Sequence, residues 1–416
     1  MELNEPELFL TIDNFEIANK SVLLRVDMNS PVDHNSGKII ETSKIKAYTD
    51  TIKELLNRDA KIVLLTHQGR PGDYDFIETK QHAEILSEIL NYHVLYYDGL
   101  FDSHAIELIK KLNSGEILML QNVRFYSEEI IDKPPEEQAK THLVRKLAPL
   151  FDLFVVDAAG AMHRSQPSLV GFPEVLPTAA GRLMEYELTR LSILKANSMR
   201  PYVFILGGGK VTDAITYIKA LLENQVADKL ILVGLVGNLF LAALGVELGK
   251  SMKFLKKKNM NILFPIAREI FRKYDDKIML PIDFTVLDLK NNEIKEISLD
   301  DLPINAFIYD IGSDTINYIS EVIGDAGLVV MRGPAGFIED ERFRRGTEEI
   351  IKAMAKSNAV TICGGGHLGI LVNELGVSDR ISHISTAGGA MISFFAKTPL
   401  PVVEELKRTA SRLLES

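Results

Sequence analysis

Cysteine is scarce in this sequence, and positive charge is not in excess. The single cysteine, Cys363, excludes an internal disulfide, and this usage is typical of proteins in a reducing cytosol. The net charge of −10 argues against nucleic acid as the main partner, because affinity for a phosphate backbone comes from an excess of Lys and Arg. No Cys/His cluster has the spacing of zinc ligands. An anionic ligand must therefore be held by a local group of cations within an acidic protein.

Long apolar runs are also lacking. The longest apolar stretch, residues 230–246, is interrupted by Asn238 and by glycines, and it is shorter than the usual transmembrane length. Residues 1–10 are acidic and have no basic segment, unlike a secretory signal. We therefore expect a soluble, cytoplasmic protein that has no membrane partner.

What the sequence does have is a regular alternation of apolar strands and amphipathic helices, in a chain of 416 residues that is too long for one ordinary core. The expected strands are 21–26, 61–66, 94–97, 117–121, 152–156, 202–206, 229–233, 278–280, 306–310, 327–331, 360–363 and 381–385. The expected helices include 45–56, 82–90, 103–112, 178–195 and 239–248. This alternation predicts an α/β fold with two Rossmann-like, doubly wound parallel-sheet lobes. We place the lobes at residues 1–180 and 196–399 and a connecting hinge helix at 181–195.

Basic and polar side chains gather at the strand ends of the first lobe. They are Asn29, His67, Arg70, Arg124, His163 and Arg164. Each alone also fits a structural histidine or a surface ion pair. Parallel sheets bind ligands beyond the carboxyl ends of their strands, and arginine matches phosphate and carboxylate with two hydrogen bonds. This clustering of basic and polar side chains at the strand ends therefore favours a site for a small, multiply charged anion.

Glycine gathers instead in the second lobe, where 20 of the 28 glycines follow Arg200. An apolar strand at 202–206 runs into Gly207-Gly-Gly, and Lys210 opens a helix, an arrangement that favours an anion at the helix N-terminus. A tight turn without a ligand is the alternative for this turn alone. Residues 364–369 also match the dinucleotide fingerprint, but Ser385 and Thr386 stand where a ribose-binding acidic residue is needed. A mononucleotide phosphate turn is therefore favoured over a dinucleotide site.

Taken in order, eight short motifs resemble those of the phosphoglycerate kinase family, from about residue 20 to residue 400. They are Arg-Val-Asp-Met-Asn-Ser-Pro (25–31), His-Gln-Gly-Arg-Pro (67–71), Gln-Asn-Val-Arg-Phe (121–125), His-Arg (163–164), Leu-Gly-Gly-Gly-Lys-Val-Thr-Asp (206–213), Gly-Pro-Ala-Gly-Phe-Ile-Glu (333–339), Gly-Gly-Gly-His (364–367) and Ser-Thr-Ala-Gly-Gly-Ala (385–390). His367-Leu368 resembles the archaeal branch, since other branches commonly have Asp-Thr there.

The resemblance implies reversible phosphoryl transfer between ATP and 3-phosphoglycerate, giving ADP and 1,3-bisphosphoglycerate, with Mg²⁺ and by hinge closure. It assigns 3-phosphoglycerate to Asp27, Asn29, Lys44, His67, Gly69, Arg70, Arg124 and Arg164. It assigns the nucleotide to Gly207, Gly208, Lys210, Glu339, Gly365, Gly366, His367 and Leu368, and the metal to Asp213. Lys44, Lys210 and Arg164 are the implied catalytic residues. The resemblance also implies a tail (400–416) that packs on the first lobe and a monomer or small homo-oligomer.

Two positions depart from the family pattern. Lys44 stands where the family has its catalytic arginine, and Ala214 stands where many members have a second lysine. The first change keeps a positive charge but loses the planar fork of arginine, and the second removes a cation. A catalytically weakened relative that binds phosphoglycerate therefore stays open as an alternative, as does a nicotinamide-dependent oxidoreductase. Arg25 is the alternative to Lys44 as the catalytic cation.

Overall fold

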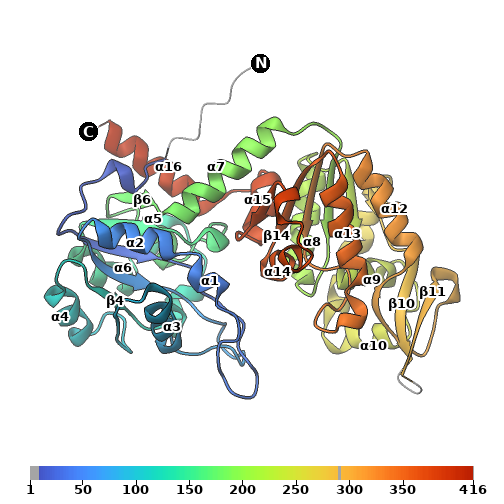
Figure 1. The fold of residues 1–416 in the computed structure, drawn as a ribbon, viewed down its shortest axis with the longest axis horizontal. Helices are drawn as coiled ribbons and strands as arrows, with labels where there is room; N and C mark the ends of the chain where they lie inside the picture. Colours follow the sequence, from blue (N-terminus) through green and yellow to red (C-terminus); the bar gives the residue numbers. More distant parts are fainter. Residues whose placement is uncertain (1–8, 289–291, 416) are drawn as a thin grey trace. The chain divides into compact units, whose positions relative to one another are not determined.

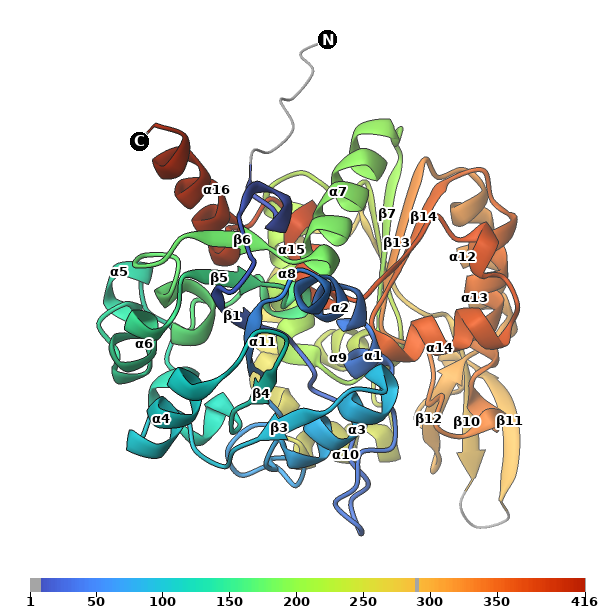
Figure 2. The ribbon, with the colours of Figure 1, turned by 60° about the vertical axis from the view of Figure 1, so that its left-hand side comes forward.

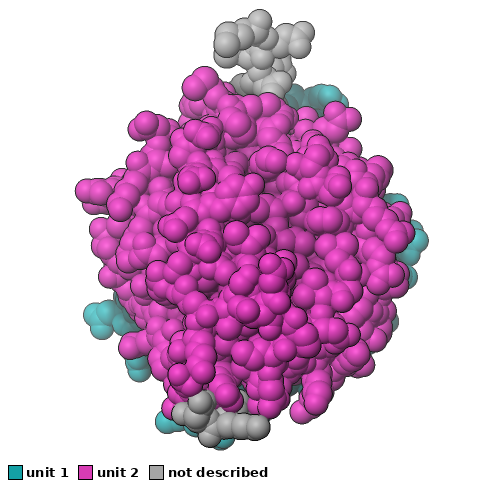
Figure 3. All heavy atoms as spheres, turned by 90° about the vertical axis from the view of Figure 1, so that its right-hand side faces the viewer, with its two compact units in different colours: residues 1–189, 399–416 teal, residues 190–398 magenta. Residues whose placement is uncertain are grey.

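The structure is a computed structural model that describes residues 9–288 and 292–415 (Figure 1). The chain forms two compact units, which we call unit 1 (residues 1–189 and 399–416) and unit 2 (residues 190–398). Atoms of unit 2 are magenta in Figure 3. Within the described ranges, no helix has the length and apolar character needed to cross a membrane.

Unit 1 is built on a six-stranded, fully parallel sheet with the strand order β3-β4-β2-β1-β5-β6. The strands are β1 (Ser21–Arg25), β2 (Lys61–Leu65), β3 (Val94–Tyr96), β4 (Ile117–Met119), β5 (Leu153–Val156) and β6 (Thr178–Ala180). The helices are α1 (Ser43–Lys46), α2 (Thr49–Asn57), α3 (Lys80–Leu90), α4 (Ser103–Lys111), α5 (Pro135–Gln138), α6 (His142–Leu147), α7 (Arg182–Asn197, shared with unit 2) and α16 (Pro401–Leu414).

The core of unit 1 follows from the alternation of side chains along each strand. Leu24 of β1 is fully buried on one face of the sheet, in a cluster that includes Ile52 of α2 and Leu86 of α3. Phe154 of β5 points to the other face, where its ring lies 5.2 Å from that of Phe172. Both faces are therefore covered, as a parallel sheet requires.

Residues 178–180 differ from the expected helix. They form β6, which pairs in parallel with β5, and the helical pattern begins only at Arg182 with α7. The end of β5 thus gains a backbone partner that a helix could not supply.

The C-terminal helix α16 lies beside β6 (Figure 2). Val402 donates its amide to the carbonyl oxygen of Met162 (3.3 Å), and Arg412 Nη2 donates to that of Pro173 (2.8 Å). Arg408 forms an ion pair with Glu174 at 2.6 Å. The last helix of the chain is therefore part of unit 1.

Unit 2 contains a second six-stranded parallel sheet, with the order β15-β14-β13-β7-β8-β9. Its strands are β7 (Tyr202–Leu206), β8 (Lys229–Leu232), β9 (Ile278–Met279), β13 (Leu328–Arg332), β14 (Val360–Gly364) and β15 (His383–Ser385). Its helices are α8 (Val211–Glu223), α9 (Gly234–Ala243), α10 (Lys250–Lys257), α11 (Phe264–Tyr274), α12 (Ser313–Gly324), α13 (Arg345–Lys356), α14 (Gly366–Glu374) and α15 (Gly389–Phe395).

The two faces of this sheet are also covered. Ile205 of β7 shares a buried cluster with Ile319 of α12 and Ile350 of α13. Phe204 points the other way, with its ring 6.1 Å from that of Phe395 in α15. Two parallel sheets covered by helices confirm the predicted fold class.

Two expectations for unit 2 were wrong. Residues 306–310 were expected in the parallel sheet, but β12 (Phe307–Ile311) belongs to a separate three-stranded antiparallel sheet with β10 (Asp283–Asp288) and β11 (Glu293–Ser298). The helix expected at 239–248 is α9, which begins at Gly234 and ends at Ala243. Gly234 and Gly237 belong to its first turns, and a Cβ at Gly237 would come within 2.6 Å of the carbonyl oxygen of Leu232. Gly237 therefore serves close packing of helix on strand, whereas a Cβ at Gly234 would come within 2.9 Å of the carbonyl oxygen of Pro334 in the turn after β13.

We predict that Leu24→Ala lowers the free energy of unfolding by about 2–5 kcal/mol, because it leaves a cavity in a fully buried cluster. Leu95→Ala, on the edge strand β3, is the matched control because this side chain is 39% exposed, and it should cost less than about 1 kcal/mol. Urea denaturation of both variants measures the difference. Equal losses would contradict the assigned core.

Candidate functional site

In unit 1, the segments that follow β1, β2, β4 and β5 leave the sheet at the same edge, because the strands are parallel. Asp27 and His67 meet there, with His67 Nε2 3.6 Å from Asp27 Oδ1. Lys44 of α1 reaches the same carboxylate, with Nζ 3.8 Å from Oδ2. Three residues predicted from separate motifs are therefore adjacent.

Two fully buried amide side chains fix the loops at this edge. Gln68 Nε2 donates to the carbonyl oxygen of Ser30 (2.9 Å), and the Ser30 amide donates to Gln68 Oε1 (2.8 Å). Asn122 Nδ2 donates to the carbonyl oxygen of Gln68 (2.7 Å). In addition, the Gly69 amide donates to Asn29 Oδ1 at 2.9 Å. Hydrogen bonds thus hold the loops after β1, β2 and β4 together in the ligand-free protein.

The arginines of this edge differ in burial. Arg124 is buried and donates from Nη1 to the carbonyl oxygen of Gly69 at 2.5 Å. Burial, followed by the charges of Arg164 and Arg25, lowers the pKa of Arg124 to about 10. Arg70 is exposed and Arg164 is half-buried, and among the described residues neither has a carboxylate partner. The edge therefore carries positive charge that internal acids do not neutralise.

The titratable pair at the centre of the edge is held in defined charge states. Burial acts to raise the pKa of Asp27, but the nearby cations, Lys44 foremost, outweigh it and hold that pKa below its ordinary value. Burial also lowers the pKa of His67 well below its ordinary value, and Arg124 adds to this effect while Asp27 opposes it. At neutral pH, His67 is uncharged and Asp27 is ionised.

Arg25 is fully buried, which contradicts the alternative that it replaces Lys44 as the catalytic cation. Its guanidinium donates to Ser168 Oγ (2.7 Å), to the carbonyl oxygen of Val26, and to His67 Nδ1 (3.1 Å). The Arg25 side chain therefore has no solvent-accessible surface that a ligand could contact.

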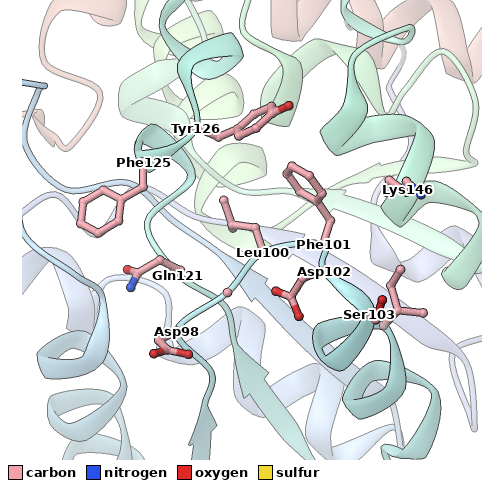
Figure 4. A pocket seen from close by; sticks show the side chains of 11 residues that line it. Asp98, Leu100, Phe101, Asp102, Ser103, Gln121, Phe125, Tyr126 and Lys146 are labelled. Atoms are coloured by element: carbon pink, nitrogen blue, oxygen red, sulfur yellow. The ribbon is translucent and has the colours of Figure 1, made fainter.

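Another hollow of unit 1, of about 570 Å³, lies beyond the ends of β3 and β4 (Figure 4). Its lining includes the carboxylates of Asp98 and Asp102 and a single cation, Lys146. Asp102 is already used, because it caps α4 by accepting from the amides of His104 and Ala105. The arginines of the predicted site do not line this hollow, and its charge does not suit an anion.

Unit 2 contains a cavity of about 500 Å³ at the carboxyl edge of its parallel sheet, with both apolar and polar walls. It is lined by Gly208, Gly209, Gly234, Leu235, Asn238, Ser251, Phe254, Pro281, Phe284, Phe307, Ile308, Tyr309, Asp310, Ile311, Pro334, Ala335, Gly336, Phe337 and Glu339. Two predicted nucleotide residues, Gly208 and Glu339, therefore line one cavity.

The glycine turns of this cavity allow close approach of backbone. The Gly208 amide donates to the carbonyl oxygen of Pro334 at 2.9 Å, and a Cβ at Gly207 would overlap that same oxygen. Gly208 and Gly333 have positive φ values of 77° and 79°, which glycine adopts without strain. The turns after β7 and β13 can therefore touch each other and still expose backbone.

The other predicted residues of unit 2 do not line this cavity. Gly365 precedes α14, and Gly366 and His367 are exposed in its first turn. The side chain of Leu368 is buried in the core, so only its backbone can face a ligand. Lys210 is the exposed N-cap of α8, and Asp213 is half-buried in the first turn of that helix. In the described parts of the chain, no group of three or more His, Cys, Asp or Glu residues could hold a metal ion.

Sequence reasoning missed several residues at these two edges. In unit 2 they include Arg332, which ends β13 and lies over the Tyr217 ring with Cζ 4.9 Å from its centroid. Asp310 lines the cavity, and burial raises its pKa to about 7 although two backbone amides donate to it. The position of Arg332 beside a glycine turn is a signal that could have found it. The contacts of Asp310, Gln68 and Asn122 join distant segments, which a sequence pattern does not reveal.

Known phosphoglycerate kinases are similar to nearly the whole length of this chain. The family model described as phosphoglycerate kinase matches residues 12–397. The phosphoglycerate kinase of Methanothermus fervidus is 42% identical over 405 residues, covering 97% of this chain and 98% of that protein. The enzyme of Methanobacterium bryantii is 46% identical over 399 residues, covering 96% and 97%.

A solved structure is also similar. The crystal structure of phosphoglycerate kinase from Pyrococcus horikoshii OT3 matches with a TM-score of 0.87 and 40% identity, covering 97% of this chain and 99% of that one. These findings confirm the resemblance and give no support to the oxidoreductase or to the weakened relative. The chain belongs to the phosphoglycerate kinase family.

Proposed function

We propose that this protein transfers a phosphoryl group reversibly between ATP and 3-phosphoglycerate, with the phosphoglycerate bound by unit 1 and the nucleotide by unit 2. The observation that carries this assignment is the difference between the two carboxyl edges. Unit 1 offers arginines that lack acidic partners within the described residues, whereas unit 2 offers glycine turns around a cavity of about 500 Å³. The first suits a small, multiply charged anion, and the second suits a nucleotide.

In unit 1, Arg70, Arg124 and Arg164 would bind the phosphate and carboxylate of 3-phosphoglycerate. His67, Asn29 and the backbone of Gly69 would orient it from the loops that Gln68 and Asn122 hold. The carboxylate that accepts the phosphoryl group is already ionised at neutral pH, so the site needs no general base. Catalysis then consists of in-line positioning and charge stabilisation, with Lys44 and Arg164 as the cations of this unit.

In unit 2, Glu339 would accept hydrogen bonds from the ribose hydroxyls inside the cavity. The backbone at Gly207 and Gly208, the side chain of Lys210 and the first turn of α14, from Gly365 to Leu368, would hold the phosphates. Asp213 fits Mg²⁺, because this ion is commonly bound by one or two carboxylates together with substrate phosphates. When bound, Mg²⁺ neutralises charge that develops on the transferred group.

Because the two substrates are assigned to different units, transfer requires a closed state in which they meet and water is excluded. We propose α7 as the hinge, since the boundary between the units falls within it, at Thr189 and Arg190. For the domains, we propose the unit boundaries in place of the limits 1–180 and 196–399, because α7 continues to Asn197.

The direct test of the function is a coupled assay on the purified protein. We expect ATP consumption only when 3-phosphoglycerate and Mg²⁺ are both present, because the reacting groups come from different units. ATP hydrolysis that proceeds at a substantial rate without 3-phosphoglycerate would contradict the proposal, as would NADH binding comparable to ATP binding.

Arg70→Ala should weaken 3-phosphoglycerate binding by about 1.5–3 kcal/mol, the usual contribution of a hydrogen bond to a charged group, and should leave ATP affinity nearly unchanged. Lys210→Ala should show the reverse pattern. The control is Arg145→Ala, which removes an exposed arginine from α6 of the same unit. Titration calorimetry with each ligand separates the cases. Equal loss of both ligands in Arg70→Ala would show that the units are wrongly assigned.

Lys44→Ala should lower kcat strongly while nucleotide affinity stays nearly constant, because a cation at the transferred group acts mainly in the transition state. Such a cation can contribute about 10³–10⁵ in rate. Lys44→Arg should turn over as fast as the wild type or faster. Lys46→Ala, on the same helix, controls for the loss of an exposed lysine. A kcat for Lys44→Ala within about threefold of wild type, less than about 1 kcal/mol on the barrier, would show that Lys44 is not catalytic.

A further inference from the structure

Next to the phosphoglycerate-binding edge of unit 1 lies a series of buried, hydrogen-bonded polar side chains to which the proposed reaction assigns no role. It begins at Glu129, which is 1% exposed, in the turn η3 (Ser127–Ile130). Glu129 Oε1 accepts from Ser168 Oγ at 2.5 Å, and Oε2 accepts from the Ser168 amide at 3.0 Å. Both oxygens of this carboxylate are therefore committed to one serine, in the segment η6 (Pro167–Gly171).

Arg25 connects these two side chains to His67 of the site. Arg25 Nε donates to Ser168 Oγ at 2.7 Å, and Nη2 lies 3.7 Å from Glu129 Oε1. The same Nη2 lies 3.1 Å from Nδ1 of His67. Glu129 and Ser168 thus set the position of the guanidinium, and the guanidinium contacts the imidazole.

This last contact determines where the imidazole carries its proton. A guanidinium has five donors and no acceptor, so His67 Nδ1 must accept the hydrogen bond with its lone pair. The ring is then neutral, and its only N–H is on Nε2, the nitrogen 3.6 Å from Asp27 Oδ1. A second proton, on Nδ1, would point at a buried cation.

We propose that Glu129 and Ser168 are positioning residues that act through Arg25 to hold His67 as its neutral Nε2–H tautomer, which donates a hydrogen bond to the phosphoglycerate. The proposal rests on the proposed function for the identity of the ligand. It assigns His67 the role of a hydrogen-bond donor to an anion, whereas the neighbouring arginines supply the charge.

The other charged groups that face His67 support the same state. Arg124, Arg25 and Arg164 disfavour an imidazolium, and Asp27 favours it. Asp27 is itself engaged by Lys44 at 3.8 Å. Burial acts in the same direction as the three arginines, because it disfavours the charged ring.

The tautomer can be observed directly in the full-length, ligand-free protein. In protein with ¹⁵N- and ¹³C-labelled histidine, nine residues give signals, and His67→Asn assigns the one of interest. We expect the wild type to show the Nε2–H pattern for His67, unchanged from pH 5.5 to 8. A pattern of the Nδ1–H tautomer, or a titration near pH 6.5, would overturn the proposal without any variant.

Ser168→Ala tests the positioning role. It removes the acceptor of Arg25 Nε, so His67 should show mixed tautomers or titrate within this pH range. The KM for 3-phosphoglycerate should rise about tenfold, the factor for one ordinary hydrogen bond, with the KM for ATP unchanged. Ser168→Thr retains the hydroxyl and should restore the wild-type pattern.

Thr51→Val is the matched control, because it also removes a buried hydroxyl that donates to a buried carboxylate, that of Asp157 (2.6 Å). It should lower stability and leave the His67 signals as in the wild type. Identical His67 spectra in Ser168→Ala and Thr51→Val would overturn the positioning role. If the spectra behave as expected but the protein fails to transfer phosphate in the coupled assay, the proposed function is wrong and the tautomer assignment stands.

Discussion

The burial of one positive charge, the guanidinium of Arg25, is the constraint on which the site of unit 1 depends. Removing a cation from water costs several kcal/mol unless partners replace the water. Here Glu129, Ser168, His67 and the carbonyl of Val26 supply those partners. They lie on segments far apart in the chain, so satisfying this one side chain requires the ends of β1 and β2 and the turns η3 and η6 to meet. Arg124 and Arg164 lie close enough to that centre to interact electrostatically with it.

The two units present different groups at the carboxyl edges of similar parallel sheets. In unit 1, side chains carry the charge, and buried amides such as Gln68 and Asn122 fix the loops that bear them. In unit 2, glycine turns line the cavity, and glycine is needed where turns touch, as at Gly207 against Pro334. The proposed reaction, which needs no general base, suits this difference, because each unit would have only to hold and polarise its own ligand.

The sequence predicted most of the parallel strands, and it singled out Asp27, Lys44 and His67, which meet at one edge, because both follow from local patterns. It failed where tertiary contacts outweigh them. Residues 178–180 have a helical pattern but gain backbone partners as a strand beside β5. The helix expected at 239–248 begins earlier, at Gly234, and Gly237 lets α9 pack closely on the carbonyl oxygen of Leu232 at the end of the preceding strand. The roles of Gln68 and Glu129 could not be predicted, because their partners Asn122 and Ser168 lie 54 and 39 residues away.

The most direct test of the account is to map each ligand separately by NMR on methyl-labelled and amide-labelled full-length protein. With 3-phosphoglycerate alone, signals from the loops after β1, β2, β4 and β5 should shift. With a non-hydrolysable ATP analogue and Mg²⁺, signals from the turns at 207–209 and 333–339 and from the first turn of α14 should shift. If 3-phosphoglycerate alone shifts the glycine turns of unit 2 and leaves the loops of unit 1 unchanged, the assignment of one substrate to each unit is contradicted.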